Sequence, residues 1–404
     1  MHTRRPTGPA RKRTNGQDSQ DGLDRRQFIG RAGALAGALA FGPALLAACG
    51  SSSAGVSASG KGKQCPVPTQ STTKELSISN WPLYIDKKTV SEFQKATGIK
   101  TTYKEDYNDN DEYFAKVRPT LKACRGIGRD MIVSTDWMAA RLINLGWVAK
   151  LDSSKIPNKK NLISTLASPS WDPNRDYSLP WQSGMTGIAY NKKLVKKPVT
   201  SVADLLDPAY KGKVTFLTEM RDAVGLFMLL EGKDPTKATF ASAKSAFDAI
   251  EKAKNGGQIR RFTGNDYGDD LTAGNVVAAM AWSGDVVQLQ ADNKDLEFVI
   301  PADGGMIWAD NMLVPAPSTH YADAETWMNY VYDPTHAAQI TDEVQYISPV
   351  QGVGEVLKTT DPSVANNPLV NPPASLKQRL HIFGGLTPAV EQQFNARFNS
   401  IIHA

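Results

Sequence analysis

From about residue 74 onward, short apolar runs of strand character alternate with segments of helical spacing, and this order of elements constrains the fold most. Helical spacing over 87–97 and 138–145 stops at Gly98 and Gly146, and glycine is the residue that most often ends a helix. Strands that alternate with helices favour α/β architecture with mainly parallel sheets. The predicted strands are residues 76–80, 99–103, 130–133, 185–190, 213–217, 276–282, 296–300 and 312–314, and a further helix covers 239–254.

The chain is too long for one ordinary hydrophobic core. It has 404 residues, of which 41% are hydrophobic and 22% are charged. These proportions are typical of a folded globular protein and exclude a disordered or membrane-embedded one. Since single cores stop growing at about 250–300 residues, we expect two or three domains.

The first 48 residues have the pattern of a targeting segment and are left out of the fold prediction. Arg25 and Arg26 end a basic stretch that precedes a weakly apolar run over 32–48. This arrangement resembles a twin-arginine export signal; the alternative is a chance arginine pair before an ordinary apolar helix. A membrane-spanning helix needs about 20 strongly apolar residues, and this run is shorter and interrupted by glycines and Pro43.

The leader ends in Leu46-Ala47-Ala48-Cys49, which resembles the processing box of bacterial lipoproteins. That resemblance implies that Cys49 becomes an acylated N-terminus. Several acyl chains give stable anchoring, because each buried methylene contributes about 0.8 kcal/mol. The Gly/Ser-rich stretch that follows predicts a flexible tether over 49–73. The alternative is a disordered linker without an anchor.

The positive charge of the chain is confined to the leader. The formal net charge is +5, and residues 1–48 hold eight Lys/Arg and three Asp, so the remainder carries 38 positive and 38 negative groups. A nucleic-acid-binding surface needs a basic excess in the folded part. We therefore expect no nucleic-acid partner.

Catalytic and metal-binding motifs are missing from the sequence. It contains no GxSxG, HExxH, phosphate-binding loop or Cys/His zinc spacing, and we predict neither an enzyme nor a metal or cofactor site. The adjacent Asp269 and Asp270 are interpreted as a solvated turn. After Cys49 only Cys65 and Cys124 remain, and in an exported protein this even pair is predicted to form a disulfide.

Tryptophan and acidic residues recur where predicted strands end. In open α/β sheets ligands bind beyond the carboxyl ends of the strands. Aromatic faces attract ammonium groups by about 0.5–2 kcal/mol, and carboxylates add charge-assisted hydrogen bonds. Together these residues favour an elongated cationic amine as ligand, although a single Trp in such a place usually belongs to the core. The stretches are residues 80–84, 134–137, 218–222, 280–285 and 304–310.

The chain resembles the spermidine/putrescine-binding proteins of ABC importers over nearly all of residues 74–400. The stretch GGMIWADNMLVPA is the most specific of the matching motifs, whereas ADLLDPAYKGKV is also frequent in binding proteins for other solutes and supports the fold more than the ligand. The other matching stretches, in chain order, are SNWPLY, FQKATGIK, DMIVSTDWMAARL, DYSLPW, GMTGIAYN, TSVADLLDPAYKGKV and AMAWSG.

This resemblance implies a two-lobe periplasmic-binding-protein fold of type II, with the ligand in the cleft between the lobes. The first lobe would be 74–182 plus 309–355 and the second 183–308 plus 356–404. The implied function is capture of spermidine or putrescine by hinge closure and delivery to an ABC importer permease. The implied protein is a monomer that is lipid-anchored to the extracytoplasmic face of the membrane or lies in the periplasmic space.

The resemblance also implies a set of ligand-binding residues. Trp137 falls where the family often has Tyr, and Thr135 where it has Ser. A C-terminal Gln contact of the family aligns only loosely, near His381, which leaves the preferred polyamine open. The matched positions are Trp81, Tyr84, Thr135, Trp137, Glu219, Asp222, Trp282, Trp308, Asp310 and Tyr346.

Two other readings stay open. The first is a binding protein for another small cation, such as a quaternary amine; Glu219, Asp222 and Asp310 favour primary or secondary ammonium instead, because these have N–H donors. The second is a secreted hydrolase whose site has no recognisable motif. Because Trp308 and Asp310 lie two apart on a predicted extended segment, we expect both to face one groove, with Glu219 and Asp222 reaching a second nitrogen.

Overall fold

The computed structural model describes residues 62–403, so the predicted export signal, Cys49 and the first part of the tether lie outside the described residues. The strands in this part of the chain are β1 (Glu75–Asn80), β2 (Lys100–Glu105), β3 (Met131–Thr135), β4 (Leu179–Asn191), β5 (Val214–Leu217), β6 (Ile259–Thr263), β7 (Ala278–Trp282), β8 (Leu296–Val299), β9 (Gly305–Leu313) and β10 (Leu380–His381). The α-helices there are α1 (Lys87–Thr97), α2 (Asn110–Lys122), α3 (Asp136–Asn144), α4 (Met220–Leu230), α5 (Phe240–Asn255), α6 (Tyr267–Thr272), α7 (Ser283–Leu289), α8 (Tyr321–Val331), α9 (Pro334–Val344), α10 (Val353–Thr360), α11 (Pro362–Ala365), α12 (Ala374–Lys377) and α13 (Pro388–Ile402).

Local signals in the sequence set several of these boundaries. The Asp86 side chain caps α1 by accepting from the backbone N–H of Lys88, and the helix ends at Gly98, whose φ of 71° is left-handed. Thr239 and Ser242 form a reciprocal cap at the start of α5. The predicted helices at 87–97, 138–145 and 239–254 are thereby confirmed as α1, α3 and α5.

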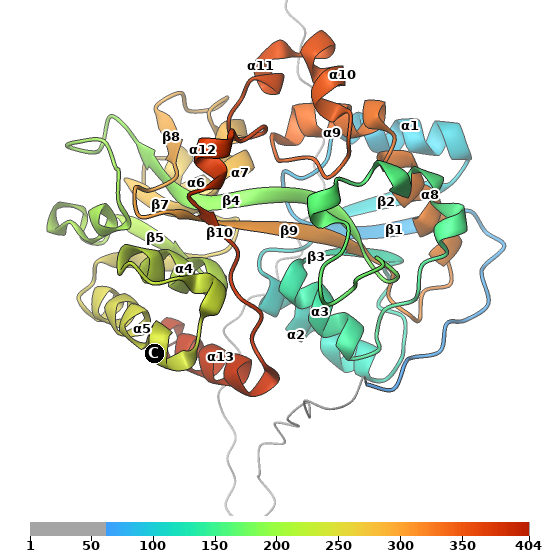
Figure 1. The fold of residues 1–404 in the computed structure, drawn as a ribbon, viewed down its shortest axis with the longest axis horizontal. Coiled ribbons are helices and arrows are strands. Elements are labelled where there is room, and N and C mark those ends of the chain that lie inside the picture. The colour runs from blue at the N-terminus through green and yellow to red at the C-terminus, as the bar shows by residue number, and fades with distance from the viewer. Residues whose placement is uncertain (1–61, 404) are drawn as a thin grey trace, which may run out of the picture. The chain divides into compact units, whose positions relative to one another are not determined.

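The strands form one mixed sheet, shown in Figure 1. Its order is β2-β1-β3-β9-β4-β7-β5-β6, with β10 beside β9 and β8 beside β4. The outer pairs β1–β2, β1–β3, β5–β6 and β5–β7 are parallel, whereas β4 and β9 pair antiparallel with each other and with β3, β7 and β8. The prediction of mainly parallel sheets was therefore wrong for the centre of the sheet. There the two long strands β4 and β9 pair with strands far away in the sequence, and a local sequence pattern does not specify such pairs.

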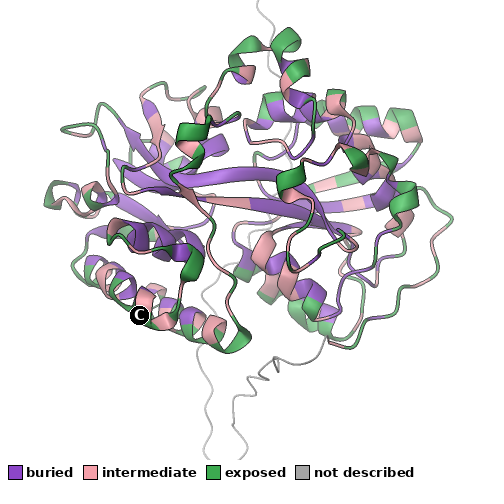
Figure 2. Ribbon diagram, in the orientation of Figure 1, coloured by how far each residue is buried: buried purple, intermediate pink, exposed green. Residues whose placement is uncertain are grey.

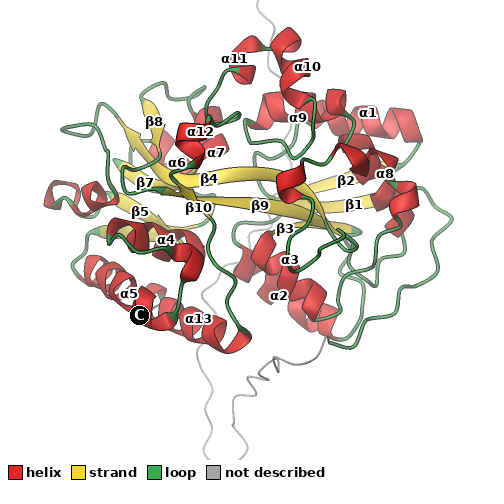
Figure 3. Cartoon of the chain, in the orientation of Figure 1, coloured by secondary structure: helices red, strands yellow, loops and turns green. Residues whose placement is uncertain are grey.

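Helices cover both faces of the sheet. Figure 3 shows α2, α3, α4, α5 and α13 along one face and α1, α8, α9 and α10 along the other. Burial follows from this arrangement: every residue of β4 is buried, and the strand is coloured as buried throughout in Figure 2. The predicted α/β class is confirmed.

The pairing of β4 with β9 is interrupted between Pro180 and Ser183, where the register shifts. Before the shift, β4 pairs with the part of β9 that also pairs with β3; after it, β4 pairs with β7 and β8. Such an irregularity bends a strand and increases its twist. The predicted lobe boundary at residues 182 and 183 falls at this bend.

Residues 62–73 lie along the side of the sheet that holds β1 to β3. The backbone N–H groups of Gly62 and Ser71 donate to the carbonyl oxygens of Asn144 and Thr319. Cys65 is paired with Cys124 in a disulfide, with a Cα–Cα distance of 5.4 Å, as the even cysteine count predicted. Residues 62–73 of the predicted tether are thus in contact with the folded part of the chain.

Candidate functional site

Asp310 lies near the centre of the sheet, on β9, and is 3% exposed. Its carboxylate accepts from the Thr135 hydroxyl at 2.7 Å and from the Tyr84 hydroxyl at 2.9 Å. Burial raises the pKa of Asp310 to about 7, although both hydrogen bonds oppose the shift. The structure thus brings three predicted site residues from β3, β9 and the loop after β1 into direct contact.

Asp222 is held in the first turn of α4, beside Trp282. The indole N–H of Trp282 donates to the Asp222 carboxylate at 2.9 Å. Burial raises the pKa of Asp222 to about 6, against hydrogen bonds from Trp282 and Thr186 that favour the ionised form. The indole N–H of Trp308 donates to the Thr186 hydroxyl at 2.9 Å, so both tryptophans belong to one polar network around this carboxylate.

A third buried carboxylate, Asp285, was missed by the sequence prediction. It lies in the first turn of α7 and accepts from the hydroxyls of Tyr346 at 2.6 Å and Tyr267 at 2.7 Å, and from the Asn265 amide at 2.8 Å. Burial raises the pKa of Asp285 to about 6. The available signal was its position three residues after Trp282, inside a stretch already selected for its Trp and acid.

Five predicted aromatic side chains enclose these carboxylates. Ring centroids lie 5.7 Å apart for Trp81 and Trp282, 6.3 Å for Trp282 and Trp308, 5.8 Å for Trp308 and Tyr346, and 4.9 Å for Tyr346 and Tyr84. Most of these contacts are edge to face, which is the favourable geometry for aromatic pairs. The rings therefore form one continuous wall, which we call the aromatic cluster (Trp81, Tyr84, Trp282, Trp308 and Tyr346).

Two glycines make room for this wall. A Cβ atom at Gly184 on β4 would lie 2.5 Å from the Trp308 ring and 2.8 Å from the Tyr346 ring. A Cβ atom at Gly284 on α7 would overlap the Tyr346 ring. The close approach of the rings to the backbone thus depends on glycine at both positions.

Glu219 lies immediately before α4, three residues before Asp222 in the chain. It accepts from the backbone N–H and the side-chain amide of Asn110, both at 2.8 Å, and the same amide also donates to Thr135. Burial and the nearby Asp109 carboxylate raise the pKa of Glu219 well above its usual range. A chain of hydrogen bonds therefore runs from Glu219 through Asn110 and Thr135 to Asp310.

Within residues 62–403 these four carboxylates form no ion pair, since none of the ion pairs there involves Glu219, Asp222, Asp285 or Asp310. By contrast, the Asp270 carboxylate lies 2.9 Å from Nε of Arg261, so this member of the adjacent acid pair has an ordinary structural role. Buried carboxylates without a partner are costly when ionised, and a positively charged ligand would remove that cost.

Trp137 is the predicted site residue that the structure separates from the aromatic cluster. It lies in the first turn of α3, and its ring faces the guanidinium groups of Arg221, with Cζ 4.0 Å from the ring centroid, and Arg141, at 5.1 Å. His381 is also apart from the cluster, since it pairs with Met306 between β10 and β9.

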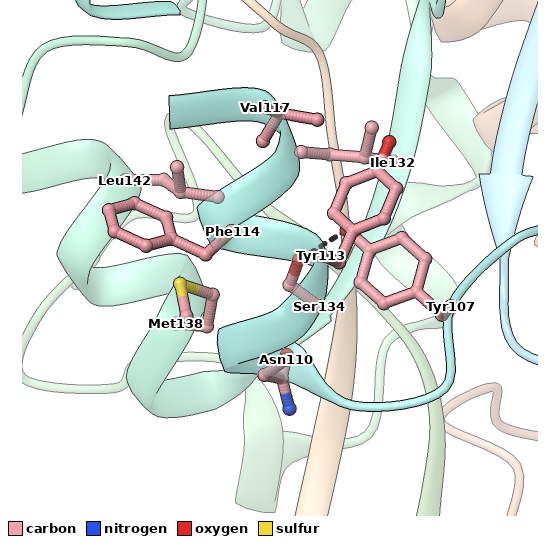
Figure 4. Close-up of a pocket in the computed structure, with 9 residues that line it drawn as sticks. All are labelled: Tyr107, Asn110, Tyr113, Phe114, Val117, Ile132, Ser134, Met138 and Leu142. Carbon is pink, nitrogen blue, oxygen red and sulfur yellow. Dashed lines mark hydrogen bonds between the residues drawn. The ribbon is translucent and has the colours of Figure 1, made fainter. Parts of the chain in front are cut away.

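A small gap lies behind the site, between α2, α3 and β3. Figure 4 shows its lining, including Tyr107, whose hydroxyl is 2.9 Å from that of Ser134. The space among these side chains does not admit a water molecule. It is therefore a packing gap and not a ligand site.

Comparison with known proteins identifies the class. Residues 88–372 match the family model for bacterial extracellular solute-binding proteins, and the chain belongs to this family. Its relatives include the spermidine/putrescine-binding periplasmic protein of Escherichia coli, 27% identical over 300 residues, with 74% of this chain and 83% of that protein covered. The putrescine-binding periplasmic protein of the same organism is 30% identical over 340 residues, with 79% of this chain and 89% of that protein covered.

Solved structures agree with this assignment. A structure from Listeria monocytogenes, assigned to a spermidine/putrescine ABC transporter, superposes with a TM-score of 0.72 at 27% identity and covers 81% of this chain and 99% of that one. The fold is that of the type II periplasmic binding proteins of ABC transporters, as the resemblance implied. Membership of the family indicates a periplasmic or other extracytoplasmic location.

Two further findings concern residues 62–403 only. No helix in this part of the chain combines the length and the apolar character needed to cross a membrane. No group of three or more His, Cys, Asp or Glu side chains there is arranged to hold a metal ion.

Proposed function

We propose that the protein captures a polyamine outside the cytoplasm and delivers it to the permease of an ABC importer. The observation that carries this proposal is the set of four buried carboxylates that form no ion pair within residues 62–403, placed against the five rings of the aromatic cluster. A polyamine supplies what this arrangement lacks, namely positive charge with N–H donors at its ends and apolar methylenes between them. Relatives of the chain include spermidine- and putrescine-binding proteins, which agrees with this ligand class.

The carboxylates favour primary or secondary ammonium over a quaternary amine. A quaternary nitrogen has no N–H donor, so it would use the aromatic faces and leave the lone pairs of Asp222, Asp285 and Asp310 without new hydrogen bonds. Each of these carboxylates already accepts at least one bond from the protein, which fixes its direction. An ammonium group that enters therefore meets acceptors held in place.

Calorimetric titration and thermal-shift assays with four compounds test the proposal. We expect putrescine or spermidine to bind with a Kd in the micromolar range or tighter and to stabilise the protein by mass action. Choline tests the quaternary amine, and 1,4-butanediol, which keeps the length of putrescine without its charge, is the matched control. The proposal fails if neither polyamine binds, or if choline binds more tightly than both.

Capture would proceed by closure of the predicted lobes. The site joins side chains from both: Trp81, Tyr84, Thr135, Asp310 and Tyr346 from 74–182 plus 309–355, and Glu219, Asp222, Trp282 and Trp308 from 183–308. A ligand that contacts both groups stabilises the closed arrangement over an open one. The register shift of β4 between Pro180 and Ser183 lies at the predicted lobe boundary and supports a hinge there.

We also propose that the mature protein is a lipoprotein anchored through Cys49. The support is the Leu46-Ala47-Ala48-Cys49 box behind the arginine-containing leader. Cys49→Ala should move the folded protein into the soluble fraction or block its processing, as cell fractionation and immunoblotting would show. Unchanged, detergent-dependent membrane association of that variant would contradict the anchor.

A further inference from the structure

The ring of Trp137 is already covered by a cation of the protein. Trp137 lies two residues after Thr135, whose hydroxyl donates to Asp310, and Arg221 lies between the site residues Glu219 and Asp222 in the chain. The guanidinium of Arg221 is centred 4.0 Å from the ring centroid, within the range in which an aromatic face attracts a cation. A ligand ammonium group would seek this same face.

Arg221 is held in this position by Glu391. Its Nη2 atom lies 2.6 Å from Oε1 of Glu391, and Nη2 of Arg141 lies 3.2 Å from the same oxygen. The Arg221 side chain is only 11% exposed and that of Glu391 only 19%. Ion pairs of this kind, shielded from solvent and shared between two arginines, are weakened less by salt than exposed ones. Arg221 is therefore a fixed part of the site edge.

The charge balance differs between the two ends of the site. Around Trp137 the two guanidinium groups of Arg141 and Arg221 are matched by Glu391 and by Asp111, which lies 3.0 Å from Arg141. Around the aromatic cluster the carboxylates have no cationic partner within residues 62–403. An ammonium group thus gains charge pairing at the cluster, whereas at Trp137 the aromatic face is already covered by Arg221 and the nearby carboxylates are already paired.

We propose that Arg221 is a specificity-determining residue, a resident cation that closes the Trp137 end of the site and restricts it to a short diamine. This inference rests on the proposed function. A diamine of putrescine length places its two ammonium groups among the carboxylates of the aromatic cluster and stays clear of Trp137. A triamine such as spermidine is longer by an aminopropyl unit, whose ammonium must displace Arg221 or remain outside.

Titration of wild type and Arg221→Met with putrescine and spermidine tests this. Methionine keeps the apolar stem and removes the charge. We expect wild type to prefer putrescine, and the ratio of spermidine affinity to putrescine affinity to rise at least tenfold in Arg221→Met, with putrescine affinity changed by less than about threefold. Arg141→Met is the matched control: it removes the other arginine that contacts Trp137 and Glu391, and it should leave the ratio unchanged.

A second pair of variants separates specificity from a purely mechanical role. If Arg221 only fastens the closed form, Arg221→Met and Glu391→Gln weaken both amines equally, and this outcome overturns the proposal. If Trp137 becomes a ligand contact once Arg221 is gone, adding Trp137→Leu to Arg221→Met abolishes the gain for spermidine. If a folded Arg221→Met variant keeps the wild-type ratio of spermidine affinity to putrescine affinity, the proposed role of Arg221 is wrong, whereas the proposed function stands. If wild type binds neither amine, both the proposed function and the proposed role of Arg221 are wrong.

Discussion

Individual carboxylates account for most of the expected ligand chemistry. Asp310, Asp222 and Asp285 are buried together, and burial raises the pKa of each, to about 7, 6 and 6 respectively. Hydrogen bonds from tyrosine, tryptophan, threonine and asparagine side chains direct the carboxylate oxygens but do not neutralise them. The ionised site is thus arranged for a cation that no ion pair within residues 62–403 supplies.

Asp310→Asn should separate binding from stability. The substitution keeps the shape and removes the charge, and loss of a buried charge partner costs about 3–5 kcal/mol, or at least a hundredfold in affinity. Stability of the ligand-free protein should change far less, because the wild-type carboxylate is itself strained by burial. Calorimetric titration and denaturation curves measure the two effects, with the exposed Asp269→Asn as control. Wild-type affinity in Asp310→Asn would show that this residue is not in the site.

The raised pKa values predict opposite pH dependences for stability and affinity. In the unfolded chain these carboxyls titrate near 3.8, so their contribution to stability is complete below about pH 4 and is lost as pH rises through the folded pKa values of about 6–7. Ligand-free stability should therefore fall from pH 5 to pH 8. Amine affinity should rise over the same interval, because the cation binds the ionised carboxylates and releases protons. Calorimetry in buffers of different protonation enthalpy counts these protons, and none would be released if the carboxylates were not ligands.

At the scale of secondary-structure elements, short segments carry the site residues at their ends. The N-terminal turn of α4 presents Glu219, Arg221 and Asp222 to three different neighbours: Asn110, Trp137 and Trp282. The start of α2 approaches the site through Asn110, while its far end is fixed by Cys124. A helix of 13 residues is about 20 Å long, which keeps the disulfide away from the ligand.

Removal of the disulfide should lower stability and spare binding. It closes a sequence separation of 59 residues, and loops of this size contribute about 2–4 kcal/mol by restricting the unfolded chain. Cys65→Ser combined with Cys124→Ser should therefore lower the free energy of unfolding by that amount, as chemical denaturation would show, with unchanged amine affinity. Reduced wild type provides the comparison; equal stability of oxidised and reduced protein would contradict a stabilising bond.

For the whole molecule, contacts between the predicted lobes determine whether the closed arrangement can form. Gly264 follows β6 in the second lobe, and a Cβ atom there would overlap the carbonyl oxygen of Asn108 in the first. Gln288 on α7 also contacts the other predicted lobe. Its side-chain amide donates to the carbonyl oxygens of Leu83 and Val344, each at 3.0 Å. If the predicted lobes move apart, both contacts are broken.

Gly264→Ala should therefore hinder closure. We expect at least a tenfold loss of amine affinity with little change in thermal stability, because the added methyl group clashes only in the closed form. Small-angle X-ray scattering should show that the amine compacts wild type but not the variant. Gly385→Ala is the control, since no atom lies within 4 Å of the Cβ it would add. Normal affinity in Gly264→Ala would mean that ligand binding does not require this contact.

Much of the molecule follows from local sequence. Helix α1 begins after Asp86 and ends at Gly98 because both signals lie within the helix's own turns, and the matching motifs identified the family and most of the aromatic cluster. Helix α4 was missed, since ten of its 11 residues are buried and it has no polar face to give a helical period. Asp285 was missed as a site residue because its partners Tyr267 and Tyr346 are 18 and 61 residues away.

The sequence by itself therefore determined the class of fold, three of the helices, the approximate position of most strands and the types of side chain in the site. Tertiary structure decided which of those side chains meet, because contacts between residues far apart in the chain depend on packing that no local pattern records. The difference is clearest at Trp137. Its motif predicts a ligand contact, whereas in the folded chain Arg221, which is 84 residues later, covers the ring because Glu391 from the C-terminal helix holds it there.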